Sequence, residues 1–168
     1  MRTLYPPVLA ALLSLAAGTV SASEAGFLKT LAGGWTGSGM MKRTTASSPV
    51  NLDCTFQSKV SGEALSMNGT CTGLIVLSRE VSATVTARGT QYSGSYVGPS
   101  GGVSKLNGGR SGDAINLAVR WSKIINGDRT ASMTIQRLGN NAIRIKTVDK
   151  DPASGKQVVT SEINLRRN

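Results

Sequence analysis

The sequence predicts an all-β protein, a single antiparallel up-and-down β-barrel of about 8–10 strands with a short N-terminal helical turn. Three observations lead to this fold class. Apolar and polar residues alternate along many successive segments, which is the pattern of half-buried strands. Clusters of Gly, Asn and Pro separate these segments at a spacing of about 8–12 residues. The 168 residues suit one domain, and closure into a barrel removes the exposed edges that so many strands would leave.

Residues 1–22 predict a signal peptide that is not part of the fold. Arg2 supplies a positive start, an apolar run follows, and Val20-Ser21-Ala22 presents small residues to a signal peptidase. The apolar run is shorter than the roughly 20 residues that cross a bilayer, so a retained transmembrane helix is the weaker alternative. We therefore expect cleavage after Ala22, a barrel domain over 23–168 with no transmembrane span, and a periplasmic or secreted location.

The barrel domain is expected to begin with one helical segment, from Ser23 to Leu31. Ser23 can cap this helix, and Phe27, Leu28 and Leu31 share its apolar side. Strands then follow in series, with turn signals between them such as Asn107-Gly108-Gly109. The expected strands are 35–43, 50–60, 65–77, 81–88, 91–97, 102–106, 114–121, 130–138, 142–148 and 157–166.

Cys54 and Cys71 predict a disulfide between two neighbouring strands. Export places them in an oxidising compartment, where an even pair of cysteines is normally bridged. A turn near residues 61–64 would place position 54 opposite position 71 in a hairpin. Residues opposed in this way have Cβ atoms roughly 4.5–5.5 Å apart, close to what a disulfide needs.

The composition excludes most enzymatic and metal chemistry. The chain has no histidine, which removes the commonest general base and a frequent zinc or haem ligand. The closest acidic pair, Asp149 and Asp151, is expected to lie solvated in a turn beside Pro152. The glycine clusters match neither a P-loop nor a dinucleotide fingerprint. We therefore expect no catalytic residue, no metal and no cofactor, and a hydrolase that uses two carboxylates is the disfavoured alternative.

Basic residues outnumber acidic ones, 19 Lys and Arg against 9 Asp and Glu, for a formal net charge of +10. Such an excess favours anionic partners such as lipid headgroups or acidic polysaccharide. Nucleic acid is not an expected partner, because the aromatic residues are few and because export separates the protein from nucleic acid. The candidate residues are dispersed, so ordinary solvation of the surface is the alternative. They are Lys42, Arg43, Arg120, Lys123, Arg144 and Lys146.

Residues 27–39, FLKTLAGGWTGSG, resemble the start of a calycin or lipocalin barrel, in which a short helical turn leads to Gly-x-Trp on the first strand. The resemblance implies that Arg166 or Arg167, near the end of the last strand, covers Trp35. The sequence is also similar to a group of small exported alphaproteobacterial proteins. These share a Gly-Trp-x-Gly-x-Gly opening, two cysteines and a Tyr-x-Gly-x-Tyr-like strand, which residues 92–96 match. Membership in this group implies the fold and the compartment but does not identify a ligand.

Together these features predict an exported, non-catalytic β-barrel of the bacterial cell envelope that binds an apolar or anionic ligand or an envelope component. The expected pocket residues are aromatic side chains in the barrel, which could instead pack as a solid core. They are Trp35, Tyr92, Tyr96 and Trp121. The alternative function is inhibition of a secreted or host protease or lysozyme, and an exposed segment 23–26 that enters an enzyme cleft would favour it.

Overall fold

The computed structural model describes residues 23–73 and 77–168, so the predicted signal peptide lies outside the described residues. The described chain begins with helix α1 (Glu24–Lys29). Ser23 caps it, since the Ser23 hydroxyl accepts a hydrogen bond from the backbone N–H of Gly26 at 3.1 Å. Within 23–73 and 77–168, no helix is long and apolar enough to cross a membrane.

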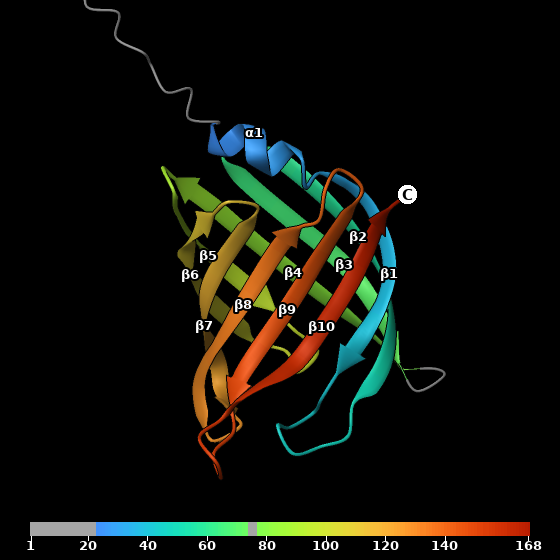
Figure 1. The fold of residues 1–168 in the computed structure, drawn as a ribbon, viewed down its shortest axis with the longest axis vertical. Helices are drawn as coiled ribbons and strands as arrows, with labels where there is room; N and C mark the ends of the chain where they lie inside the picture. Colours follow the sequence, from blue (N-terminus) through green and yellow to red (C-terminus); the bar gives the residue numbers. More distant parts are fainter. Residues whose placement is uncertain (1–22, 74–76) are drawn as a thin grey trace, which may run out of the picture.

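The ten strands found in this part of the chain form one closed antiparallel barrel, which confirms the predicted fold class (Figure 1). Each strand pairs with its neighbours in sequence, and β1 closes the barrel on β10 in a register that sets Trp35 opposite Arg167. The strands are β1 (Gly33–Met41), β2 (Val50–Ser61), β3 (Ala64–Gly73), β4 (Leu77–Arg88), β5 (Gln91–Val97), β6 (Val103–Ser111), β7 (Ala114–Ile125), β8 (Asp128–Arg137), β9 (Ala142–Lys150) and β10 (Gln157–Arg167).

The turn predicted at Asn107-Gly108-Gly109 is wrong, because β6 continues through it to Ser111. Gly108 lies opposite Leu117 on β7, and a Cβ atom at Gly108 would collide with the backbone carbonyl of Asn116. This glycine therefore permits a close approach of two strands. The hairpin turns instead at Gly112, whose φ of 57° is left-handed and suits glycine.

The predicted disulfide is present in the β2–β3 hairpin. Cys54 lies opposite Cys71 in the strand register, with their Cα atoms 4.1 Å apart and their sulfur atoms bonded. Both side chains are buried on the inner face of the barrel. The bridge therefore links two strands from inside.

The barrel interior is filled at one end only. Helix α1 lies across that end (Figure 1), where Leu28 and Leu31 are fully buried and each contributes about 1.5–3 kcal/mol of hydrophobic stabilisation. The strands beneath supply further fully buried side chains, among them Leu65, Leu106 and Ile143. We call this the closed end. The opposite end, formed by the loops 42–49, 98–102, 126–127 and 151–156, is called the open end.

Candidate functional site

A cavity of about 450 Å³ occupies the part of the barrel nearer the open end. Loop residues of that end, such as Gly98–Gly101 and Asn126, belong to its lining, so the cavity begins among these loops and extends inward. Most of the wall is apolar because the alternating strands turn one face to the interior. The apolar wall residues include Leu52, Phe56, Met67, Val81, Met133 and Ile163.

Two of the four aromatic residues predicted to form a pocket, Tyr96 and Trp121, line this cavity. Their ring centroids are 6.1 Å apart, with the planes tilted by 57°. Burial raises the pKa of the Tyr96 phenol to about 12, because the charged phenolate is poorly solvated there. Tyr96 is therefore protonated near neutral pH and offers the cavity a neutral hydroxyl.

The cavity wall also contains a carboxylate, Asp149, which was expected to be solvated in a turn. That expectation is wrong: Asp149 is 3% exposed and occupies the last inward position of β9, which runs to Lys150. The indole N–H of Trp121 donates to its Oδ1 atom at 3.1 Å, and the Thr160 hydroxyl donates to Oδ2. Asp151 does lie in the following turn, where it accepts hydrogen bonds from Thr45 and Ser154.

The other two predicted pocket residues, Trp35 and Tyr92, lie at the closed end. Trp35 donates its indole N–H to the Leu31 carbonyl at 3.1 Å and to the Ser58 hydroxyl at 3.0 Å. The Arg167 guanidinium covers the Trp35 ring, with its carbon atom 4.2 Å from the ring centroid. Arg167 thus occupies the place that the calycin resemblance implied for Arg166 or Arg167, whereas Arg166 is exposed.

Tyr92 belongs to a buried polar cluster that ties helix α1 to the barrel. Its hydroxyl donates to Glu24 Oε2 at 2.5 Å, and Arg110 donates to both oxygens of the same carboxylate at 2.8 Å. The hydrogen bonds from Arg110 hold the pKa of Glu24 below its usual range, against the opposing effect of burial. This cluster was missed from sequence, because its three members come from distant segments and form no local motif.

The structure separates the predicted basic residues into three places. Lys42 and Arg43 line the cavity near the open end together with Arg79, which was not predicted. Arg120 and Lys123 are exposed on β7. Arg144 and Lys146 lie on β9 beside Glu162: Arg144 is 3.7 Å from its carboxylate, and Lys146 faces it in the β9–β10 register.

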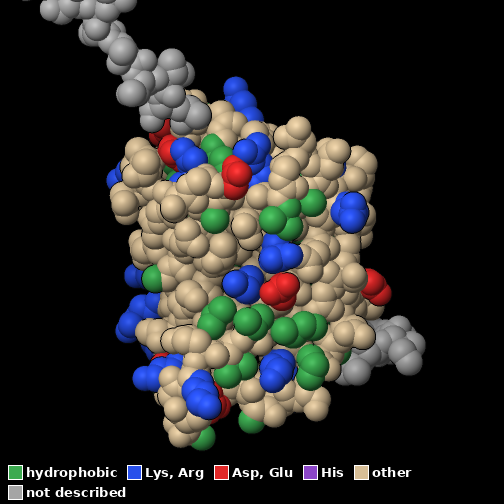
Figure 2. All heavy atoms as spheres, viewed as in Figure 1, with side chains coloured by type: hydrophobic (Ala, Val, Ile, Leu, Met, Phe, Trp, Pro, Cys, Tyr) green, Lys and Arg blue, Asp and Glu red, His purple; other side chains and the backbone are tan. Residues whose placement is uncertain are grey.

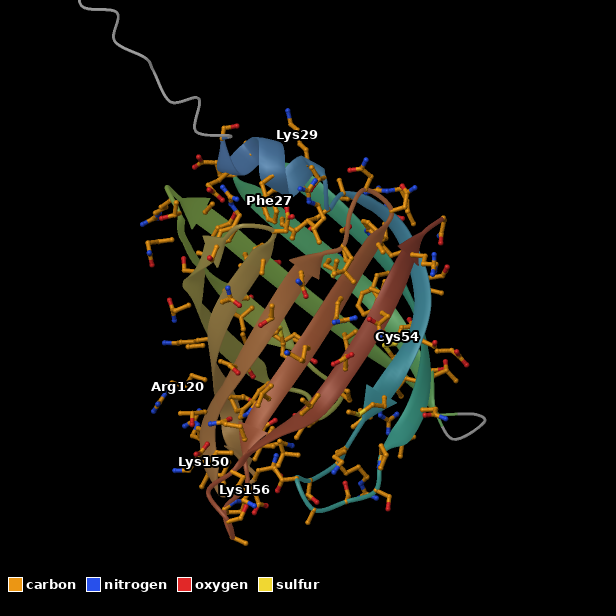
Figure 3. All side chains as sticks on the ribbon, in the orientation of Figure 1. Phe27, Lys29, Cys54, Arg120, Lys150 and Lys156 are labelled. Atoms are coloured by element: carbon orange, nitrogen blue, oxygen red, sulfur yellow. A yellow bond between two sulfur atoms is a disulfide. The ribbon has the colours of Figure 1, made fainter. Side chains whose placement is uncertain are left out.

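Exposed basic side chains gather on one side of the open end. Figure 2 shows Lys and Arg along the lower left edge of the molecule, and Figure 3 places Arg120, Lys150 and Lys156 there. We call the exposed set Lys105, Arg120, Lys123, Lys150 and Lys156 the basic rim.

Two features distinguish the basic rim from an ordinary solvated surface. Lys105 and Arg120 lie directly opposite each other on β6 and β7, an arrangement of like charges that destabilises a sheet. No residue of the basic rim belongs to a salt bridge within the described residues. Two apolar side chains near the same end are also exposed, Val103 at 64% and Ile124 at 70%.

Comparisons with known proteins support the fold and leave the family open. No protein-family model matches the chain, and no curated protein matches it. Among solved structures, the chain is similar to Rv2717c from M. tuberculosis, with a TM-score of 0.59 and 14% sequence identity. The match covers 84% of this chain and 94% of Rv2717c. At this identity the likeness shows a shared small β-barrel fold.

Proposed function

We propose that the protein is a non-catalytic binding protein that holds a small, largely apolar molecule in the barrel cavity. The observation that carries the proposal is the cavity itself, about 450 Å³ with a mainly apolar wall. This volume lies in the range of roughly 300–1,000 Å³ that is typical of small-molecule sites. Unfilled apolar space costs stability, and the same barrel is densely filled at its closed end. An apolar ligand would offset that cost.

The polar groups of the cavity support a ligand with one polar end. The buried part of the lining offers Asp149, the Tyr96 hydroxyl and Ser104 among many apolar side chains, and Lys42, Arg43 and Arg79 line the cavity near the open end. Polar groups set in a mainly apolar wall are the usual means by which a pocket orients its ligand. We include export in the proposal, since the Cys54–Cys71 disulfide is compatible with an oxidising compartment.

A cavity-filling substitution tests this function. Ala83 lines the cavity, whereas its neighbour Thr84 is exposed on the outside of the same strand. We expect Ala83→Trp to lower the affinity for the fluorescent apolar probe N-phenyl-1-naphthylamine at least tenfold, because the indole takes up cavity space. Thr84→Trp is the matched control and should bind the probe as the unmodified protein does. Fluorescence titration measures both.

Equal probe affinity in the two tryptophan variants would contradict binding in the cavity. Failure of the unmodified protein to bind the probe, or any apolar molecule of similar size, would contradict the proposed function as a whole. Circular dichroism of each variant shows whether the barrel has formed.

We further propose that the basic rim binds an anionic lipid surface, an assignment favoured by the like charges facing each other at Lys105 and Arg120, by the lack of salt bridges from the rim within the described residues, and by the exposed Val103 and Ile124. Lipid headgroups attract each nearby Lys or Arg by about 1 kcal/mol, and exposed apolar side chains can enter the interface. Because the basic rim and the cavity both lie at the open end, a membrane bound to the rim would be close to the cavity.

The membrane assignment predicts a loss of vesicle binding in a triple variant with Lys105, Arg120 and Lys123 each changed to Gln. We expect partitioning onto phosphatidylglycerol-containing vesicles to fall at least tenfold, and the remaining binding to weaken as salt is added. A second triple variant, with Gln at the exposed closed-end positions Lys29, Lys59 and Arg88, has the same net charge and should bind like the unmodified protein. Equal losses in the two variants would show that only net charge matters, and the rim assignment would then be wrong.

The alternative function, enzyme inhibition by the N-terminal segment, would require residues 23–26 to leave their place in the fold, although Ser23 and Gly26 are exposed. Residues 23–26 form the helix cap and first turn, and Glu24 within them is buried against Arg110 and Tyr92. Insertion of this segment into an enzyme cleft would have to break that cluster.

A further inference from the structure

Asp149 is the one acidic residue in the described lining of the cavity. It lies on β9, and it is held by Trp121 from β7 and Thr160 from β10. These contacts orient both carboxylate oxygens from different strands. The inference that follows rests on the proposed function, because it concerns which apolar molecules the cavity accepts.

The carboxylate of Asp149 can accept more hydrogen bonds than the described side chains donate to it. An ionised carboxylate has two oxygens with about four acceptor positions, and the described side chains that donate to Asp149, Trp121 and Thr160, supply one hydrogen bond each. Because Asp149 belongs to the lining of the cavity, a molecule bound there would lie beside this carboxylate.

Although Lys42, Arg43 and Arg79 line the same cavity nearer the open end, Asp149 also has no direct ionic partner in the described part of the protein. None of the salt bridges found there includes Asp149, although its side chain is 3% exposed. Lys42 lies close in the fold, since its backbone N–H donates to the Thr160 carbonyl, but its ammonium group donates to the Thr45 carbonyl at 3.4 Å. A buried carboxylate is costly unless it is paired and hydrogen-bonded, so a donor from a ligand would be favourable here.

We propose that Asp149 is the specificity-determining residue of the cavity and selects an apolar molecule whose polar end is a hydrogen-bond donor, a protonated amine or a hydroxyl. An amine would supply the missing positive charge as well as the hydrogen bond, so it binds more tightly than the alcohol. A carboxylate end would place a second negative charge beside Asp149 and is disfavoured. This preference opposes the one that the overall positive charge of the protein suggests.

Three probes with the same ten-carbon chain test the proposal: decylamine, decan-1-ol and decanoate. Each is titrated at neutral pH as a competitor of N-phenyl-1-naphthylamine. For the unmodified protein we expect affinity to decrease from amine to alcohol to carboxylate. In Asp149→Asn the affinity for decylamine should fall at least tenfold, and the affinity for decan-1-ol should fall by less. The affinity for decanoate should equal or exceed its value for the unmodified protein.

Two further variants separate recognition from structure. Asp53→Asn removes the same charge from an exposed position and should leave the affinity order unchanged. Thr160→Val removes one donor to Asp149 but keeps the carboxylate, so the preference for the amine should persist. If Asp149 only braces Trp121 and Thr160, both Asp149→Asn and Thr160→Val will lower the unfolding temperature and neither will change the affinity order.

An unchanged affinity order in Asp149→Asn overturns the inference while leaving the proposed function intact. Preferential binding of decanoate to the unmodified protein also overturns it, and would assign the polar end of the ligand to the basic residues Lys42, Arg43 and Arg79. If none of the probes binds, the proposed function fails, which is a distinguishable result.

Discussion

Replacing Trp35 with alanine is expected to lower the free energy of unfolding by about 3–5 kcal/mol. The side chain is 1% exposed, so the substitution leaves a large cavity beneath α1. It also removes the indole N–H that is shared between Leu31 and Ser58, and the ring on which Arg167 lies. Because these contacts join the end of the helical segment to β2 and β10, we expect the closed end to loosen. Urea unfolding followed by circular dichroism measures the change.

Two neighbouring substitutions serve as controls for Trp35→Ala. Trp35→Phe keeps most of the apolar ring but loses the N–H donor, so its cost should be about 1–2 kcal/mol. Thr36→Ala alters an exposed side chain of the same strand and should change stability by less than about 0.5 kcal/mol. The role assigned to Trp35 is wrong if Trp35→Ala costs no more than Thr36→Ala.

Replacing Arg110 with methionine is expected to lower the free energy of unfolding by about 3 kcal/mol, the lower end of the range for breaking a buried ion pair. Glu24 is 7% exposed and Arg110 is 19% exposed, so the carboxylate would remain buried without its cation. Methionine retains an apolar stem against the Phe27 ring, over which the guanidinium now lies at 4.7 Å. Thermal and urea unfolding both measure the loss.

The pH dependence of stability identifies Glu24 as the group affected by Arg110→Met. The pKa of Glu24 is lowered on folding, chiefly by the hydrogen bonds from Arg110. A lowered pKa contributes stability that is fully present above the unfolded value of about 4.3 and is lost as the pH falls through the folded value. Without Arg110, burial acts against the charged form of Glu24, so the variant lacks this contribution above the unfolded pKa. The difference in stability between the two proteins should therefore be largest near neutral pH and should shrink as the pH falls and Glu24 becomes protonated.

Arg137→Met is the matched control for Arg110→Met. Its partner Asp113 is 56% exposed, and such a surface pair contributes about 0–1 kcal/mol. If the two methionine variants lose the same stability and share one pH profile, the buried cluster is not what fastens α1 to the barrel.

Much of the fold follows from local patterns. Alternation along β7, with Ile115, Leu117 and Val119 inward, requires nothing but the period of a strand. The opposition of Cys54 and Cys71 follows from the same period and a turn near residues 61–64. The error at Gly108 has the opposite cause, because a glycine in a turn and a glycine that admits a neighbouring strand look alike in sequence.

By itself, the sequence determined the class of fold, the helical start, the disulfide and the absence of histidine chemistry, because each of these depends on composition or on residues close in the chain. Only the tertiary structure decided that the barrel is filled near α1 and hollow near the open end, since that depends on which inward side chains meet across the barrel. The same holds for Asp149. Its burial depends on β9 passing Val148, where the strand was expected to end, and on Trp121 and Thr160 arriving from two other strands.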